Sequence, residues 1–244
     1  MSEVKYRHEY KYPVTDAEIA MLRSRLRTVL RPDPYVIKGM YNIRSLYFDD
    51  YDDRCFKENE DGTDPREKFR IRIYNHSTSR IALECKRKEH GKTLKTSCPL
   101  SIEQARQLVQ GEYLRDIAYQ PPVLKKLTYA MMTRCMRPVV IVEYDRIPYV
   151  YKDGNVRITF DINISSSEDF AGFLGEEIGK RQIMPVGRQL MEVKFDEFLP
   201  DHIYRTLQLG DLRQTSFSKY YLCRKYEIKN NRNGDKLYER AGHF

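Results

Sequence analysis

The stretch Phe69-Arg70-Ile71-Arg72-Ile73-Tyr74 alternates apolar residues with arginines. In a β-strand, successive side chains point to opposite faces of the sheet. Arg70 and Arg72 are therefore predicted to share one face, while Phe69 and the two isoleucines share the other. In an isolated strand this pattern commonly means only that one face packs on a core and the other meets water.

The same alternation of charged with apolar residues recurs along the chain. It is found in Glu9-Tyr10-Lys11, Glu84-Cys85-Lys86-Arg87-Lys88, Arg157-Ile158-Thr159-Phe160-Asp161 and Glu192-Val193-Lys194. Solvent-facing strands usually mix Thr, Ser, Gln and Lys, whereas the polar face here is repeatedly Arg, Lys and Glu. The repetition indicates that the charged faces serve a common purpose.

Propensity and turn residues predict about nine or ten strands, mostly antiparallel, and four or so helices. Strands are expected at 5–12, 41–48, 67–74, 80–88, 92–98, 139–145, 148–151, 156–164 and 189–195, with helices at 16–30, 53–59, 101–109, 123–136 and 196–209 and from 218. Residues 165–179 are expected to form a loop. Pro13 is expected to end the first strand.

Closing an antiparallel sheet of this size removes its edges. We therefore predict an α+β fold, a closed antiparallel β-barrel of about eight strands with helices packed outside. The apolar faces would then meet the helices, and the charged faces would line a tunnel. The residues predicted to point inward are Glu9, Lys11, Arg70, Arg72, Glu84, Lys86, Arg157 and Glu192.

Composition describes a basic chain. Its 244 residues include 43 Lys and Arg against 35 Asp and Glu, a formal net charge of +8, which suggests an anionic partner. The five cysteines form no CxxC pair, so we expect reduced thiols in a cytoplasmic protein. The N-terminus lacks an apolar signal segment, and the aliphatic run 139–142 is far too short to span a bilayer. Residues 1–229 are predicted to form one domain, followed by a polar tail at 230–244.

Buried charges need partners, so an inward excess of Arg and Lys over Glu implies a missing anion. Arginine presents a fixed fork that matches phosphate oxygens. Carboxylates in the same space suit a hard divalent cation that bridges to phosphates. The sequence has neither GxxxxGK[ST] nor GxGxxG, and it shows no Ser/His/Asp arrangement. A cationic channel for a linear polyanion, such as a triphosphate or polyphosphate, is the resulting hypothesis.

Eight motifs, in order over about residues 3–225, resemble the VTC domain, the polyphosphate polymerase domain of the triphosphate tunnel metalloenzyme superfamily. The motifs are Arg7-His8-Glu9-Tyr10-Lys11-Tyr12, Ser45-Leu46-Tyr47-Phe48-Asp49, Phe69-Arg70-Ile71-Arg72-Ile73-Tyr74, Leu83-Glu84-Cys85-Lys86, Tyr144-Asp145-Arg146, Val156-Arg157-Ile158-Thr159-Phe160-Asp161, Met191-Glu192-Val193-Lys194 and Phe217-Ser218-Lys219-Tyr220. Each motif alone is weak, whereas eight in order are specific.

The resemblance implies roles for matching residues. Phosphate binding is implied for Lys11, Arg70, Arg72, Lys86, Lys95, Arg146, Arg157 and Lys219, with Arg44 and Ser218 as further candidates. Lys92 is an alternative to Lys95 for the same phosphate-binding role, and Ser218 is equally suited to cap a helix. Glu192 is implied as the carboxylate for Mn²⁺ or Mg²⁺, with Glu9 and Glu84 as weaker metal candidates. Catalysis is assigned to Arg70, Arg72, Lys86 and Glu192.

The resemblance also implies an activity, a metal-dependent phosphotransferase of the polyphosphate polymerase type acting on a nucleoside triphosphate such as ATP. A triphosphatase or polyphosphatase on the same fold, or a module that binds polyphosphate without turnover, remains open because fold does not determine reaction. Nucleic acid is not expected as a partner. The eukaryotic polymerase subunits also contain a phosphate-sensing domain and membrane helices, which this sequence does not show. The phosphate donor, product length and oligomeric state do not follow from the sequence.

Overall fold

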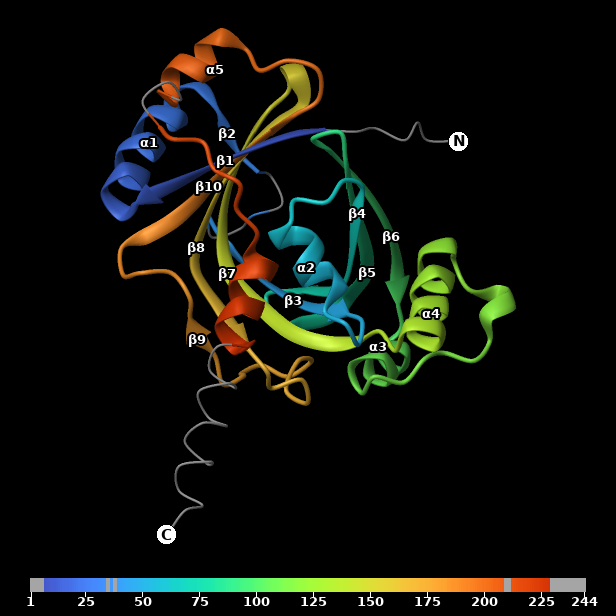
Figure 1. Ribbon diagram of the computed structural model, residues 1–244. Helices are drawn as coiled ribbons and strands as arrows, with labels where there is room; N and C mark the ends of the chain where they lie inside the picture. Colours follow the sequence, from blue (N-terminus) through green and yellow to red (C-terminus); the bar gives the residue numbers. More distant parts are fainter. Residues whose placement is uncertain (1–6, 34–35, 37–38, 209–211, 229–244) are drawn as a thin grey trace.

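The computed structural model describes residues 7–33, 36, 39–208 and 212–228. Within them, ten strands form a single antiparallel sheet, in the order β1-β10-β8-β7-β3-β4-β5-β6, with β2 added beside β7 and β9 beside β8. Figure 1 shows this sheet curled into an open half-barrel with helices on both its outer and its inner side. The predicted tail at 230–244 lies outside the described residues, as do the first two residues of the strand expected at 5–12.

The strands are β1 (His8–Thr15), β2 (Arg31–Pro32), β3 (Tyr41–Asp49), β4 (Arg66–Tyr74), β5 (Ser77–Glu89), β6 (Lys92–Leu100), β7 (Arg137–Tyr151), β8 (Val156–Ser167), β9 (Arg181–Gln182) and β10 (Arg188–Phe195). The helices are α1 (Asp16–Val29), α2 (Arg54–Glu60), α3 (Ile102–Val109), α4 (Pro122–Arg134) and α5 (Asp201–Thr206), and residues 219–228 are also helical. None of the helices in the described part of the chain is both long and apolar enough to cross a bilayer.

Two apolar cores lie on the outer side of the sheet. Phe69, Ile71 and Ile73 of β4 are buried in one core together with α3 and α4 residues such as Leu108 and Leu127. The second core joins α1 and α5 to β1, β8 and β10. A capping box, in which the Thr15 hydroxyl and the Glu18 carboxylate satisfy each other's backbone N–H groups, starts α1. The burial of Phe69, Ile71 and Ile73 confirms the apolar face predicted for the strand now labelled β4.

The prediction that all helices pack outside is wrong. On the concave face of β3 and β7, Ile43, Val140 and Val142 are buried against Tyr220 and Cys223 of the C-terminal helix. Helix α2 lies beside that helix, where the Phe56 ring stacks on Tyr221 with centroids 5.0 Å apart. An apolar concave patch has to be covered like any other, and these two helices occupy part of the space that a closed barrel would leave for a tunnel.

The prediction of a closed barrel is also wrong. β1 and β6 are the two ends of the sheet order, and in the described residues they meet only at one isolated bridge between Arg7 and Thr93. Both backbone hydrogen bonds of that bridge measure 3.3 Å. Beyond it the strands diverge, so no ladder joins them and the sheet stays open along this seam.

Two prolines did not end strands where we expected. Pro13 lies inside β1, which pairs only with β10 and therefore tolerates a missing N–H on its free side. Pro148 lies inside β7, so the segments expected at 139–145 and 148–151 form one strand. The missing N–H of Pro148 lies between two pairings of β7. The pairing with β3 ends at Arg146, opposite Tyr41, and the pairing with β2 begins at Tyr149.

The loop expected at 165–179 and the helix expected at 196–209 are both shorter than predicted. Residues 165–167 extend β8 and pair with β7, while β9 adds a further short strand to β8. The helix expected at 196–209 is limited to α5, which begins directly after Pro200. Proline at the cap position accounts for that start, because its ring restricts the preceding residue to extended conformations.

Candidate functional site

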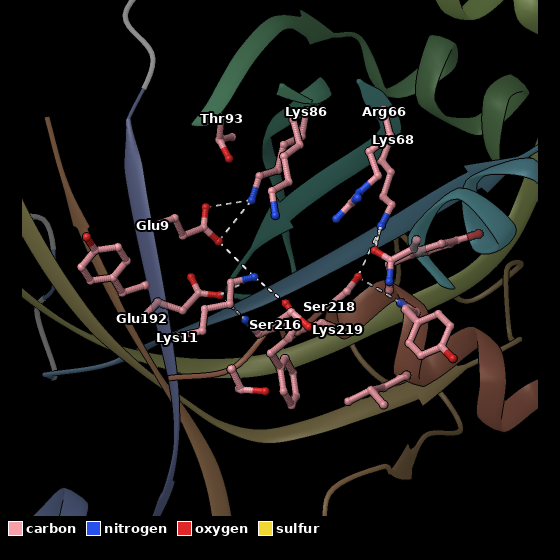
Figure 2. Close-up of a pocket in the computed structure, with 18 of the residues that line it drawn as sticks. Glu9, Lys11, Arg66, Lys68, Lys86, Thr93, Glu192, Ser216, Ser218 and Lys219 are labelled. Carbon is pink, nitrogen blue, oxygen red and sulfur yellow. Dashed lines mark hydrogen bonds and ion pairs between the residues drawn. The ribbon is translucent and has the colours of Figure 1, made fainter. Parts of the chain in front are cut away.

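A cavity of about 1080 Å³ opens on the concave face of the sheet. Most of its wall comes from β1, β4, β5, β7 and β10, and β3, β6, α2 and the start of the C-terminal helix with the segment before it complete the lining. Ten of its lining residues are Lys or Arg and three are Glu. Figure 2 shows Glu9, Lys11, Lys86, Glu192 and Lys219 pointing into this one space from different elements.

Glu192 on β10 is the centre of the inner end of the cavity. Its Oε1 lies 2.7 Å from the Lys219 Nζ, and its Oε2 lies 2.7 Å from the Lys194 Nζ. Arg146 reaches the second oxygen at 3.3 Å. Burial opposes ionisation of Glu192, but the surrounding cations, led by Lys194 and Lys219, outweigh it and hold its pKa well below the usual range.

Asp161 on β8 lies behind this centre and was not predicted as a site residue. It is fully buried and accepts hydrogen bonds of 2.6 and 2.7 Å from the Arg146 guanidinium. Its Oδ2 also lies 2.6 Å from the Lys219 Nζ. The Tyr144 ring supports both cations, with its centroid 5.3 Å from the Arg146 Cζ and 4.8 Å from the Lys219 Nζ. Asp161 therefore positions two cations at the cavity wall.

Glu84 is the centre of a second charged cluster, on β5. Arg70 reaches its Oε2 at 2.7 Å, Arg72 reaches the same oxygen at 3.5 Å, and Lys95 reaches Oε1 at 3.1 Å. The other nitrogen of Arg70 donates to the Tyr47 hydroxyl at 2.8 Å. Burial alone would raise the pKa of Glu84, but the arginines lower it strongly. Arg70 and Arg72 are thus held in fixed positions on the cavity wall.

Glu9 links β1 to β5 across the cavity. Its carboxylate lies 3.0 Å from the Lys11 Nζ and 2.9 Å from the Lys86 Nζ. Lys11 also donates to the Phe217 carbonyl oxygen at 2.6 Å. Burial lowers the pKa of Lys86 to about 8 despite the attraction of Glu9. These contacts place the segment before the C-terminal helix along one side of the cavity.

The structure brings most of the predicted residues together. Those that line the cavity are Glu9, Lys11, Arg70, Arg72, Lys86, Arg146, Glu192, Ser218 and Lys219. Ser218 also caps the C-terminal helix, because its hydroxyl accepts the Tyr221 N–H at 3.3 Å. Glu84 lies just behind the wall, paired with the arginines.

Three predicted phosphate-binding residues lie off the cavity wall. Arg44 is 1% exposed on β3 and donates to Glu143 and to backbone carbonyls of residues 173, 175 and 176. Arg157 pairs with Asp33 at 2.8 Å. Lys95 extends from edge strand β6 to Glu84. Their roles in phosphate binding stay predictions.

Several lining residues were missed by sequence reasoning. Arg66 and Lys68 continue the alternation of Arg70 and Arg72 along β4, and Lys88 and Lys194 continue that of Lys86 and Glu192. Following the period of two to the strand ends would have found them. Tyr47 and Tyr144, which support the arginines, lack such a signal because aromatic residues on strands are usually packing residues.

The carboxylates of the cavity are candidate ligands for a divalent cation. Among the described residues no three His, Cys, Asp or Glu side chains form a ready metal site. Both oxygens of Glu192 already contact cations. Mg²⁺ and Mn²⁺ are often held by one or two carboxylates plus substrate phosphates, rather than by protein alone. Glu192, with Glu9 nearby, fits that mode and does not fit a cation held by protein ligands only.

Comparison with known proteins gives a family match and a fold match. A sequence model of the VTC domain family matches residues 6–227. A search of curated proteins found no match. A candidate adenylate cyclase from Bacillus halodurans has a TM-score of 0.53 at 15% identity, with 87% of this chain and 95% of that chain covered. A candidate adenylyl cyclase from Hippeastrum, reported with a dominant triphosphatase activity, has a TM-score of 0.54 at 11% identity, with 91% and 95% covered. At these identities the likeness concerns the fold alone.

Proposed function

Because the chain belongs to the VTC domain family, we propose that it is a metal-dependent phosphotransferase of the polyphosphate polymerase type. Its substrate is a triphosphate or polyphosphate chain, including the phosphates of a nucleoside triphosphate such as ATP. Residues 1–229 act as one catalytic domain. The five unpaired cysteines support a reducing compartment such as the cytoplasm.

One observation supports this proposal above the others: Arg70, Arg72 and Arg146 converge on one cavity in which basic residues outnumber acidic ones. Each guanidinium is anchored by a carboxylate, Glu84 or Asp161, that lies behind it. Anchored forks bind planar sets of phosphate oxygens without losing much side-chain entropy. A linear polyanion matches such a wall better than a compact anion, because the cations follow the strands.

The described residues assign the following roles. Arg70 and Arg72 bind phosphate oxygens from one side of the cavity, and Arg146 and Lys219 bind them from the other. Lys11 and Lys86 hold the chain across the opening, where Glu9 keeps both ammonium groups in place. Among the described lining residues the arrangement nearest to a nucleophile with a base is Ser218 with Lys68, 3.4 Å apart, but the Ser218 hydroxyl already caps the C-terminal helix. In-line attack by an activated oxygen on a phosphorus held by these cations is therefore the reaction that we propose.

Glu192 and Glu9 are the proposed protein ligands of Mn²⁺ or Mg²⁺. When bound, the cation neutralises phosphate charge and so assists departure of the leaving oxygen. The cations now paired with Glu192 remain beside it to hold phosphates.

Hydrolysis is the second candidate. The Hippeastrum protein with the same fold is reported as a triphosphatase. The two reactions differ only in the attacking oxygen, which comes from a phosphate chain end in one case and from water in the other. Both use the same charged wall.

The test is an incubation of the purified protein with ATP and Mn²⁺, with the products resolved by ³¹P NMR. A growing mid-chain phosphate signal is expected, and it should be lost in Glu192→Gln. Orthophosphate alone would replace the polymerase with a hydrolase. Unchanged ATP, together with shifted resonances of added polyphosphate, would leave a binding module.

A matched control is Asp145→Asn. Asp145 is adjacent to Arg146 in the chain but hydrogen-bonds Asn42 and Asn163 away from the cavity. Its substitution should leave the product pattern unchanged. Loss of product in both variants would mean that the effect of Glu192→Gln is not specific to the cavity.

A further inference from the structure

Like charges face each other at two alternate positions of the β4–β5 ladder, on the side of the sheet that faces the cavity. Arg66 is opposite Lys88, and Lys68 is opposite Lys86. All four line the cavity. Like charges directly opposite on neighbouring strands destabilise a sheet. The next pair on the same side of the ladder is different, since Arg70 is opposite the carboxylate Glu84.

Among the described residues, only one of these four cations forms an ion pair with a carboxylate. Lys86 reaches Glu9. Within the described chain, Arg66 donates to the Thr63 carbonyl oxygen, Lys68 contacts only neutral oxygens, and neither Arg66, Lys68 nor Lys88 forms an ion pair. Glu9 and Asp64 act on Lys88 only from a distance, so these half-buried cations face one space with little counter-charge, an arrangement that an anion stabilises.

The described groups that contact the Lys68 ammonium are all neutral. Its Nζ donates to the Asn59 Oδ1 on α2 at 2.6 Å and to the Ser218 hydroxyl, just before the C-terminal helix, at 3.4 Å. It also lies 4.8 Å from the centroid of the Tyr220 ring in that helix. Figure 2 shows Arg66 and Lys68 pointing into the cavity beside Lys86.

The charged and titratable groups that act on Lys68 are Arg66 on β4, Lys86 on β5, Lys11 on β1 and Cys55 on α2. Burial and the neighbouring cations lower the pKa of Lys68 to about 7. A nearby anion would reverse this effect, because an opposite charge favours the protonated form of the amine.

We propose that Arg66, Lys68 and Lys88 form a second anion subsite, which holds the outer phosphate groups of a polyphosphate chain whose inner groups lie deeper in the cavity. The proposal rests on the function proposed above and adds a preference for chain length. Arg72 lies six positions after Arg66 along β4, about 20 Å of strand. A triphosphate held at Arg72 is too short to reach the Arg66 end, whereas a longer chain reaches both.

The subsite also couples binding to proton uptake. At pH 8 Lys68 is mostly uncharged, and a phosphate placed beside it draws a proton onto its Nζ. A triphosphate bound only at the inner cations Arg72, Arg146 and Lys219 does not reach Lys68 and causes no such uptake.

The experiment is isothermal titration calorimetry with tripolyphosphate and with a long, size-fractionated polyphosphate, at pH 8 in two buffers of different ionisation enthalpy. The wild-type protein should bind the long chain more tightly per site and take up more protons with it. Arg66→Gln/Lys68→Met should lose about tenfold or more in affinity for the long chain while keeping its affinity for tripolyphosphate. Lys68→Arg should keep the affinity and lose the extra proton uptake.

The matched control is Arg80→Gln/Lys57→Met, which removes two exposed cations that do not line the cavity. It should bind both ligands as the wild-type protein does. Equal loss of long-chain affinity in the control, or an unchanged long-chain affinity in Arg66→Gln/Lys68→Met, would overturn the subsite and leave the proposed function standing. A wild-type protein that binds neither ligand would refute the proposed function and the subsite with it. Thermal unfolding of each variant checks that it is folded.

Discussion

Asp161 offers a change with opposite effects on stability and on ligand binding. Its buried carboxylate contacts the Arg146 guanidinium twice and the Lys219 ammonium once, all within 2.7 Å. Asp161→Asn keeps the size of the side chain and removes its charge. Glu192 then remains the only carboxylate that contacts both cations in the described chain.

The size of the stability loss follows from the burial. Removing one partner of a buried ion pair costs about 3–5 kcal/mol, mostly because the remaining charge stays buried and unpaired. The asparagine amide keeps one acceptor oxygen, so we expect a loss near the lower end, about 3 kcal/mol. Ligand binding changes in the other direction. The asparagine amide oxygen still accepts a hydrogen bond from Arg146 and keeps it in place, while Arg146 and Lys219 no longer share their charge with a carboxylate that competes with phosphate. We expect the variant to gain about tenfold in affinity, which corresponds to about 1.4 kcal/mol.

The assay is urea unfolding of wild-type protein and Asp161→Asn, with and without tripolyphosphate at constant ionic strength. The variant should be less stable without ligand and should gain more stability from the ligand than the wild-type protein does. Asp145→Asn is the control and should change neither quantity by more than about 0.5 kcal/mol. An unchanged stability, or weaker binding of tripolyphosphate by Asp161→Asn, would refute this account of Asp161.

Three further predictions concern acid stability, Arg44 and the cysteines. Burial opposes ionisation of Glu84, but Arg70 and Arg72 hold its pKa below the value in the unfolded chain. The stabilisation that this carboxylate contributes is therefore complete above about pH 4.3 and is lost as the pH falls below that value. Urea unfolding between pH 3 and 6 should show a steeper loss of stability in the wild-type protein than in Glu84→Gln. Arg44→Met should cost about 3 kcal/mol of stability, because it leaves the buried Glu143 short of a partner. If Arg44 is purely structural, the variant keeps its affinity for tripolyphosphate. A large loss of affinity would instead support the predicted role of Arg44 in phosphate binding. Cys135 is exposed and the other four cysteines are buried, so a thiol reagent applied to the native protein should modify Cys135 first, as peptide mass spectrometry would reveal, and early modification of Cys55 would contradict the packing under α2.

Much of the site was predictable because strand alternation is strictly periodic. The period of two is enough to place Glu9, Arg70, Arg72, Lys86 and Glu192 on the charged faces of their strands, and all five line one cavity. Alternation does not reveal how far along a strand the cavity extends. Arg157 illustrates this limit, because it points to the charged side of β8 yet pairs with Asp33.

Other features depended on tertiary contacts that local sequence does not encode. Arg44 belongs to the outer face of β3, since its neighbour Ser45 is the one that hydrogen-bonds Arg72. Whether the C-terminal helix covers the outer or the inner side of the sheet depends on packing between Tyr220 and distant strands. Whether the barrel closes likewise depends on the distance between β1 and β6 beyond their single bridge, which local sequence does not reveal.

The most direct test of the charged cavity is the affinity for tripolyphosphate of a variant without its two central arginines. Arg70→Ala/Arg72→Ala is made together with Glu84→Gln, so that no buried carboxylate is left unpaired. Titration calorimetry should show a loss of about a hundredfold or more relative to Glu84→Gln alone, with the circular dichroism spectrum of the fold retained. Unchanged affinity in a folded variant would contradict the claim that this cavity binds phosphate chains.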